Sequence, residues 1–175
     1  ILSPEQLSHY GKILSDQIDW HNTGTNRFTS RCVAFMADPG ICYKYSRQDQ
    51  TGLGWHPAVL EIKWIVQQAI LNNNINPLWN YNSVQLNKYN GPGQGLTWHS
   101  DDEPDVCQEV PIASISFGAT REFLIRHKKQ NEYKWAIDLN DGTILLMAGR
   151  MQQEYQHSVP SGGQDKGPRI NLTFR

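Results

Sequence analysis

This sequence is short of cysteine, of charge of one sign and of long apolar runs, and each absence excludes a class of protein. Its three cysteines form no CxxC pair, which argues against a disulfide scaffold or a cysteine-rich zinc site and for a reducing, intracellular compartment. Sixteen basic residues are balanced by 17 acidic ones, so bulk electrostatic binding of duplex nucleic acid is disfavoured. No apolar run approaches the roughly 20 residues of a membrane span, and no signal-peptide pattern opens the chain. We expect a soluble protein of the nucleus or cytoplasm with no membrane partner.

The length and composition predict one folded unit. A chain of 175 residues is long enough to bury a substantial core, and 38% hydrophobic with 19% charged residues is too apolar and too weakly charged for a disordered segment. We expect a single domain over residues 1–175, and a monomer.

Two helices are predicted before a β-rich half. The first twenty residues are typical of a helix, with Ser3 as its cap and Gln6 completing a capping box. Residues 57–71 carry apolar side chains at three- and four-residue steps, the spacing of a second helix. Residues 21–53 between them are polar and rich in Gly, Thr and Asn. We interpret that segment as hairpins and loops laid over one face of the domain, with a short strand at Ile41–Tyr45.

After residue 80 the pattern changes to short strands between turn signals such as Asn140-Asp141-Gly142. Eight strands are predicted: Tyr81–Tyr89, Leu96–Ser100, Pro111–Phe117, Arg121–His127, Tyr133–Leu139, Thr143–Met147, Tyr155–Val159 and Arg169–Phe174. A propeller is excluded because no internal repeat is visible. The expected fold is mainly β with flanking helices, a jelly roll or double-stranded β-helix preceded by N-terminal helices and a hairpin region.

The strongest local signal for chemistry is the segment Trp98 to Glu103. In an extended chain, His99 and Asp101 point to the same side and can share a metal. His157, on a late predicted strand, is the candidate third ligand. Two histidines and one carboxylate form the facial triad of non-haem Fe(II) oxygenases. The alternative is that the HxD spacing is accidental and that both histidines only donate and accept hydrogen bonds.

The last seven residues alternate completely between polar and apolar side chains. One face carries Arg169, Asn171, Thr173 and Arg175. Two guanidinium groups on a half-buried strand need anions, because an unpaired buried charge is costly. A dicarboxylate beside the iron would satisfy both, since arginine binds carboxylates with two parallel hydrogen bonds. The alternative is an exposed edge strand with solvated arginines. Asn87 and Tyr89 share a face on an earlier strand and could hydrogen-bond the same carboxylate.

Together these segments resemble the AlkB family of Fe(II)/2-oxoglutarate dioxygenases, most of all its repair-type homologues two and three. The resemblance lies in residues 87–89, 99–103, 114–121, His157 and 169–175. It implies a catalytic jelly-roll core over residues 80–175, with Fe(II) on His99, Asp101 and His157. It also implies that 2-oxoglutarate is bound by six residues: Asn87, Tyr89, Arg169, Asn171, Thr173 and Arg175.

The resemblance further implies oxidative demethylation of alkylated nucleic acid with O2, in which an N-methyl group leaves as formaldehyde and 2-oxoglutarate becomes succinate and CO2. Residues 21–55 would form a substrate-recognition lid. The expected substrate-binding residues are Arg31, Tyr43, Lys44, Tyr45, Asp102 and Glu103. The carboxylate of Asp102 suits 1-methyladenine and 3-methylcytosine, which are cationic and present an amino donor. Because residues 21–29 offer no apolar wedge to fill a gap in a duplex, single-stranded DNA or RNA is favoured.

Two other interpretations stay open. A 2-oxoglutarate oxygenase that acts on a protein or a small molecule would use the same iron and cosubstrate residues. A non-catalytic jelly-roll binding module could hold zinc on the triad, although structural zinc is usually bound by four protein ligands and the sequence offers no fourth.

Overall fold

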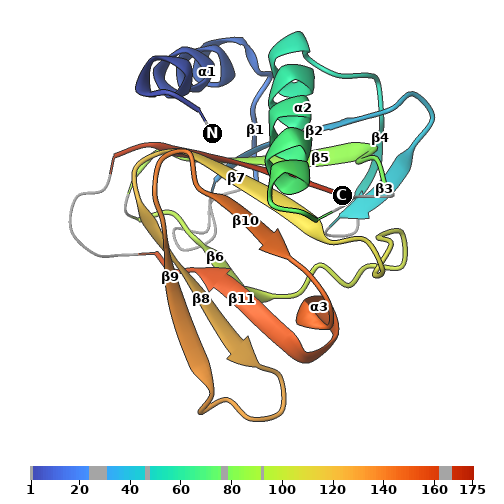
Figure 1. The fold of residues 1–175 in the computed structure, drawn as a ribbon, viewed down its shortest axis with the longest axis vertical. Coiled ribbons are helices and arrows are strands. Elements are labelled where there is room, and N and C mark those ends of the chain that lie inside the picture. The colour runs from blue at the N-terminus through green and yellow to red at the C-terminus, as the bar shows by residue number, and fades with distance from the viewer. Residues whose placement is uncertain (1, 24–30, 46–47, 76–78, 92, 162–166) are drawn as a thin grey trace.

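The computed structural model describes residues 2–23, 31–45, 48–75, 79–91, 93–161 and 167–175 (Figure 1). Helices α1 (Pro4–Gln17) and α2 (Pro57–Asn72) lie together on one side of the molecule, and the short α3 (Met151–Glu154) lies at the other end. None of the described helices is long and apolar enough to cross a membrane.

The predicted cap of the first helix is confirmed. Ser3 Oγ accepts a hydrogen bond from the backbone N–H of Gln6 at 3.3 Å, and the Gln6 side chain accepts one from the Ser3 N–H at 2.9 Å. This reciprocal pair satisfies two backbone donors that a helix otherwise leaves unpaired. The apolar faces of α1 and α2 are buried against one sheet, in a core that includes Leu14, Ile62 and Leu172.

Six antiparallel strands form the major sheet, in the order β1-β2-β5-β12-β7-β10. Their bounds are His21–Asn22, Cys32–Ala37, Ser83–Tyr89, Arg169–Phe174, Ile112–Gly118 and Ile144–Met147. At the centre, β12 pairs with both β5 and β7, so that Asn171 is opposite Asn87 on one side and Ser116 on the other. Every residue of β12 is buried. The strand is therefore neither half-buried, as the sequence predicted, nor an exposed edge, because helices cover one face and a second sheet covers the other.

Four strands form the facing minor sheet, in the order β6-β11-β8-β9, and two more form a separate hairpin, β3-β4. The bounds of the minor sheet are Leu96–His99, Tyr155–Val159, Arg121–His127 and Lys134–Leu139, and those of the hairpin are Cys42–Tyr45 and Gln48–Thr51. Figure 1 shows the minor sheet on the side of the major sheet away from the helices. The side chains between the two sheets form a second core and a cavity.

The eight predicted strands are all present, and the jelly roll is confirmed. The described strands of residues 21–53 form two hairpins, β1-β2 and β3-β4, as the sequence predicted, but β2 also joins the major sheet, which was not predicted. Cys32–Ala37 is strand β2, which pairs with the whole of β5 from Cys32 opposite Lys88 to Ala37 opposite Ser83. Its run of small and apolar residues buries Ala34 and Ala37, and this burial outweighs the polar character of the flanking sequence.

Candidate metal and cosubstrate site

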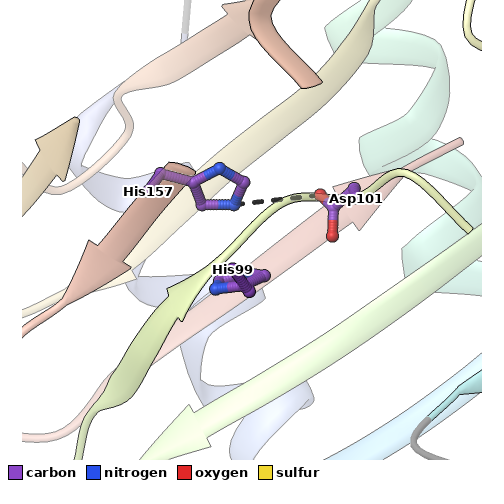
Figure 2. Close-up of side chains that lie close together, drawn as sticks. All are labelled: His99, Asp101 and His157. Atoms are coloured by element: carbon purple, nitrogen blue, oxygen red, sulfur yellow. Dashed lines mark ion pairs between the residues drawn. The ribbon is translucent and has the colours of Figure 1, made fainter. Parts of the chain in front are cut away.

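Two neighbouring strands of the minor sheet bring the predicted triad together. His157 on β11 is the direct cross-strand partner of His99 on β6, and Asp101 follows two residues after His99. The three ligand atoms lie within 4.8 Å of one another, and His157 Nε2 is 4.0 Å from Asp101 Oδ2. Figure 2 shows the three side chains grouped around one point. The convergence predicted from sequence is therefore present in the fold.

Both imidazole rings are held in position for ligation. His99 Nδ1 lies 2.8 Å from the carbonyl oxygen of Thr97, and because a carbonyl only accepts, this nitrogen carries the proton and Nε2 keeps its lone pair. His157 is 4% exposed and stacks on Phe123, with ring centroids 5.0 Å apart. A metal ion in this position would find both nitrogens already oriented.

The protonation states suit a metal cation. Burial opposes ionisation of Asp101, but Arg175, His157 and His99 together outweigh it and lower the pKa of this carboxyl. Burial, reinforced by the nearby charges of His99 and Arg175 and opposed by Asp101, lowers the pKa of His157 to about 3. At neutral pH the site thus offers an anionic carboxylate and a neutral imidazole, the forms that bind metal.

The backbone around Asp101 is fixed by two glutamines that sequence reasoning did not identify. The Asp101 N–H donates to Gln152 Oε1 at 2.9 Å, and Gln108 Nε2 donates to the Asp101 carbonyl oxygen at 3.1 Å. Gln152 is buried in α3, beside the exposed Gln153. Nothing in the sequence distinguishes these two neighbours, so only the fold identifies Gln152 as a positioning residue.

Iron fits this donor set better than structural zinc. Within the ranges that the structure describes, His99, Asp101 and His157 are the one group of three or more metal-ligating side chains, and no fourth side chain joins them. Structural zinc sites are closed by four protein ligands, whereas two histidines and a carboxylate leave positions open on Fe(II). The zinc-bearing binding module is therefore disfavoured.

A cavity between the sheets extends from the triad and is partly open to solvent. All six predicted cosubstrate residues line it: Asn87, Tyr89, Arg169, Asn171, Thr173 and Arg175. The major sheet supplies these polar side chains, while Phe123, Leu139 and Val159 of the minor sheet supply apolar ones. The two sheets thus contribute different chemistry to one space.

The surroundings of Arg169 show whether a dicarboxylate fits this cavity. The residue is 2% exposed, its Nη2 donates to Ser116 Oγ at 2.9 Å, and its guanidinium lies 5.5 Å from the centre of the Tyr89 ring. Its Nε and Nη1 are buried and make no hydrogen bond to any described residue. Unpaired donors on a buried guanidinium are costly, and a carboxylate is an anion that pairs with such a guanidinium. The residues present therefore fit 2-oxoglutarate.

Asn171 and Thr173, two of the predicted cosubstrate residues, already form a hydrogen bond with each other. Asn171 Nδ2 donates to Ser114 Oγ at 2.6 Å and to the Ile115 carbonyl oxygen at 3.1 Å, and Thr173 Oγ1 donates to Asn171 Oδ1 at 3.0 Å. The two bonds of Asn171 Nδ2 join β12 to β7, and the bond from Thr173 lies within β12. Direct contact of Asn171 and Thr173 with the cosubstrate stays a prediction.

Arg175 forms a hydrogen bond with Asp101, one of the three metal-ligating residues. The sequence predicted a cosubstrate carboxylate as its partner, and the structure shows its Nη2 donating to Asp101 Oδ1 at 2.7 Å, with both side chains almost fully buried. Arg175 therefore links the metal ligands to the cosubstrate cavity that it also lines.

The predicted substrate residues lie in different surroundings. Arg31 is 5% exposed, and its Nε donates to Asn87 Oδ1 at 2.6 Å, so it supports a cavity residue from behind. Asp102 is exposed and forms an ion pair with Lys128 at 2.9 Å, whereas Glu103 is half-buried.

Tyr43, Lys44 and Tyr45 are on β3, where they pair with residues 50, 49 and 48 of β4. Their side chains lie outside the described part of the structure, and their contact with a base stays a prediction.

Three metal-ligating side chains beside a cavity lined by arginines, in a jelly roll, define a class of enzyme. Comparison with known proteins gives the same class. The profile of the 2OG-Fe(II) oxygenase superfamily matches residues 1–175, so the chain belongs to that family. Its cofactors are Fe(II) and 2-oxoglutarate.

Within the superfamily, the chain is similar to AlkB homologues. It is 39% identical over 142 residues to the alpha-ketoglutarate-dependent dioxygenase alkB homolog 3 of Bos taurus, with 76% of this chain and 47% of the relative covered. It is 29% identical over 192 residues to the DNA oxidative demethylase ALKBH2 of Arabidopsis thaliana, with 93% and 59% covered. The chain thus spans about half the length of the first of these relatives.

One solved structure, that of OsALKBH1, superposes with a TM-score of 0.72 at 19% identity and covers 99% of this chain and 92% of that one. This likeness supports the fold.

Proposed function

We propose that this protein is an oxidative demethylase of 1-methyladenine and 3-methylcytosine in single-stranded DNA or RNA. When bound, Fe(II) and 2-oxoglutarate supply the oxidation by which O2 removes the methyl carbon as formaldehyde, leaving the restored base, succinate and CO2. The names of the relatives support this proposal, since one is a dioxygenase and another a DNA oxidative demethylase. In this proposal the chain's own residues bind and orient 2-oxoglutarate and the methylated base.

Arg169 would fix the direction in which the cosubstrate lies. It begins β12, whereas Arg175 follows the end of that strand and contacts Asp101, so Arg169 lies at the end of the strand remote from the metal ligands. A dicarboxylate bound there directs its other end toward the triad. The buried guanidinium holds the remote carboxylate by charge-assisted hydrogen bonds, and Tyr89 and Asn87 line the space between.

The acidic segment after Asp101 is the observation that carries the choice of substrate. Asp102 and Glu103 directly follow a metal ligand, and both methylated bases are cations with an amino donor. The ion pair of Asp102 with Lys128 already neutralises that carboxylate in part, whereas Glu103 is better shielded from water. We therefore assign the stronger attraction for the cationic base to Glu103, because screening by solvent weakens exposed charges.

Formaldehyde release from methylated oligonucleotides tests this function. Strands of matched sequence carry 1-methyladenine or 3-methylcytosine in DNA or RNA, single-stranded or paired, and Asp101→Ala is the control. We expect formaldehyde in amounts equal to the methyl groups lost, only with Fe(II) and 2-oxoglutarate, and faster on single strands. Equal turnover of single and paired strands would refute the strand preference. Decarboxylation of 2-oxoglutarate with no demethylation of any strand would favour a protein or small-molecule substrate.

A second experiment separates base recognition from the dioxygenase centre. In Glu103→Gln, Asp102→Asn and Tyr45→Ala, we expect slow decarboxylation of 2-oxoglutarate without substrate to persist while demethylation falls, most of all in Glu103→Gln. If all three variants demethylate as the wild type does, the assignment of the base pocket is wrong.

A further inference from the structure

A group of exposed aromatic and apolar side chains lies on the minor sheet outside the cavity. Tyr133 is 51% exposed, Trp135 50% and Ile137 38%, all on or next to the edge strand β9. Figure 1 shows the β8-β9 hairpin projecting beyond the major sheet, on the side away from α1 and α2. We call Tyr133, Trp135, Ile137 and Tyr155 the aromatic face. Large apolar side chains exposed together on one surface are typical of a binding surface.

The aromatic face is continuous with the metal site. Strand pairing sets His157 opposite Ile125, and Ile125 opposite Trp135, so the three side chains form one row on one face of the sheet. Since neighbouring strands lie about 4.8 Å apart, Trp135 stands about 10 Å from the metal ligand His157 across the sheet. Tyr155 is on the same face two residues before His157. The aromatic face therefore lies within reach of a polymer whose target group is at the metal.

Tyr155 contacts both Trp135 and His127 through edge-to-face ring contacts, and Trp135 stays half exposed. Trp135 and Tyr155 have ring centroids 5.9 Å apart at an interplanar angle of 64°, and Tyr155 meets His127 at 5.2 Å and 86°. Such edge contacts fix the orientation of the rings without covering them. An indole that is held in place and half exposed is a surface on which a planar base can stack.

The charge of the hairpin matches a polyanion. Residues 126–134 include four basic side chains and one acidic one, in a chain whose net charge is −1. Arg126 and Lys134 are cross-strand partners on the opposite face of the sheet, so Lys128 and Lys129, in the turn between the strands, are the cations not confined to that face. Lys129 and Lys134 are exposed. Lys128 Nζ donates to Asp102 Oδ2 at 2.9 Å and to the Gln152 carbonyl oxygen at 2.8 Å, which ties the hairpin to the segment after the metal ligand Asp101.

We propose that the aromatic face binds the nucleotides next to the target base of a single-stranded nucleic acid. A neighbouring base stacks on Trp135, and the phosphates lie toward Lys129. This inference rests on the proposed function and adds a binding surface to it. Aromatic side chains with interspersed cations are typical of single-strand binding without sequence preference, because every base has a face that can stack. A second copy of the chain paired along β9 is the competing occupant, although the excess of positive charge disfavours it.

The test compares Trp135→Ala with Trp135→Phe, and uses Trp64→Ala as the matched control. Trp64 is a somewhat more exposed tryptophan, at 62%, but lies on α2, behind the major sheet. Each variant is assayed with 3-methylcytosine as a mononucleotide and within a single-stranded oligonucleotide. Binding of an unmethylated fluorescent oligonucleotide is measured separately. For Trp135→Ala we expect about a tenfold higher KM for the oligonucleotide, toward the low end of the effect of one stacked base, with kcat and mononucleotide turnover unchanged. Trp135→Phe should recover most of the affinity, and Trp64→Ala should match the wild type.

The outcomes distinguish this inference from the proposed function. If no methylated substrate is turned over but Trp135→Ala still weakens binding of the unmethylated strand, the aromatic face is supported and the proposed function fails. If Trp135→Ala binds and demethylates the oligonucleotide as Trp64→Ala does, the aromatic face is refuted. Equal losses on the mononucleotide and the oligonucleotide would refute it as well, since they would indicate damage to the metal site. A wild-type dimer that Trp135→Ala converts to monomer would assign the face to self-association instead.

Discussion

Strand β12 of the major sheet is buried along its whole length, whereas β9 of the minor sheet is exposed at every position except Leu139. The two strands face the same interior space from opposite sides. The buried one carries Arg169 and Asn171, which line the cosubstrate cavity, where water must be excluded for the charge to be effective. The exposed one carries Trp135 and Ile137, which suit contact with a large substrate. The difference suggests that small-molecule binding and polymer binding are divided between the sheets.

The largest effect is expected where the two sheets meet, at the triad. His157→Ala or Asp101→Ala should remove turnover entirely, because each deletes one of three ligands and leaves Fe(II) weakly bound. Formaldehyde release and iron content after dialysis measure the two losses, and circular dichroism checks the fold. His9→Ala, which changes an exposed histidine of α1, should have wild-type activity. An active His157→Ala enzyme would disprove the triad.

The second comparison is between the two arginines of the major sheet. Arg169→Gln should raise the KM for 2-oxoglutarate roughly tenfold to a hundredfold, because charge-assisted hydrogen bonds contribute about 1.5–3 kcal/mol each. Its iron affinity should stay at the wild-type value. Arg175→Gln should lower iron affinity as well, since Arg175 donates to the metal ligand Asp101. Equal effects of the two variants on iron and cosubstrate would contradict the separate roles.

The division between buried and exposed strands also predicts stability. Leu172→Ala on β12, at 0% exposure, should lower the free energy of unfolding by about 2–5 kcal/mol through lost burial and a new cavity. Ile137→Ala on β9, at 38% exposure, should lower it by less than about 1 kcal/mol. Denaturant unfolding of the metal-free protein measures both. Similar losses would mean that β9 is covered in solution.

A smaller effect is expected from pH. The pKa of His157 is about 3 in the fold and 6.5 in an unfolded chain, so the unfolded chain binds more protons in this window. The free energy of unfolding of the metal-free protein should therefore fall as the pH drops from 6.5 toward 3, by at most about 1.4 kcal/mol per pH unit from this group. The lowered pKa of Asp101 acts in the same direction below pH 3.8.

Unfolding curves recorded with a chelator measure this dependence, and His157→Gln should flatten it. A wild-type slope in His157→Gln would assign the pH dependence to other groups.

Much of this architecture could be predicted from the sequence because its signals are local. The HxD spacing, the alternation of residues 169–175 and the capping box depend on strand and helix periodicity alone, and all three are present. Strand β2 was not predicted because the sequence that surrounds Cys32–Ala37 is polar. Its pairing with β5 also joins residues about 50 positions apart, which no local pattern shows.

The details of the site depended on the tertiary structure. No sequence pattern relates Arg175 to Asp101, or Gln152 to the backbone of Asp101, since each pair joins distant segments. Arg31 was predicted to contact substrate, and its burial against Asn87 follows from its place just before β2. The exposed rings of β9 were predicted as part of a strand, and only their register with His157 shows that they share the face of the metal site.

The most direct test of the account is 2-oxoglutarate binding to the Fe(II)-loaded protein without oxygen, followed by the visible charge-transfer absorption of iron chelated by a 2-oxo acid. We expect a saturable band in the wild type, a band that needs roughly tenfold to a hundredfold more 2-oxoglutarate in Arg169→Gln, and none in His157→Ala. Saturation of Arg169→Gln at the wild-type concentration, or a full band in His157→Ala, would contradict the claim that the two sheets form one Fe(II)/2-oxoglutarate centre.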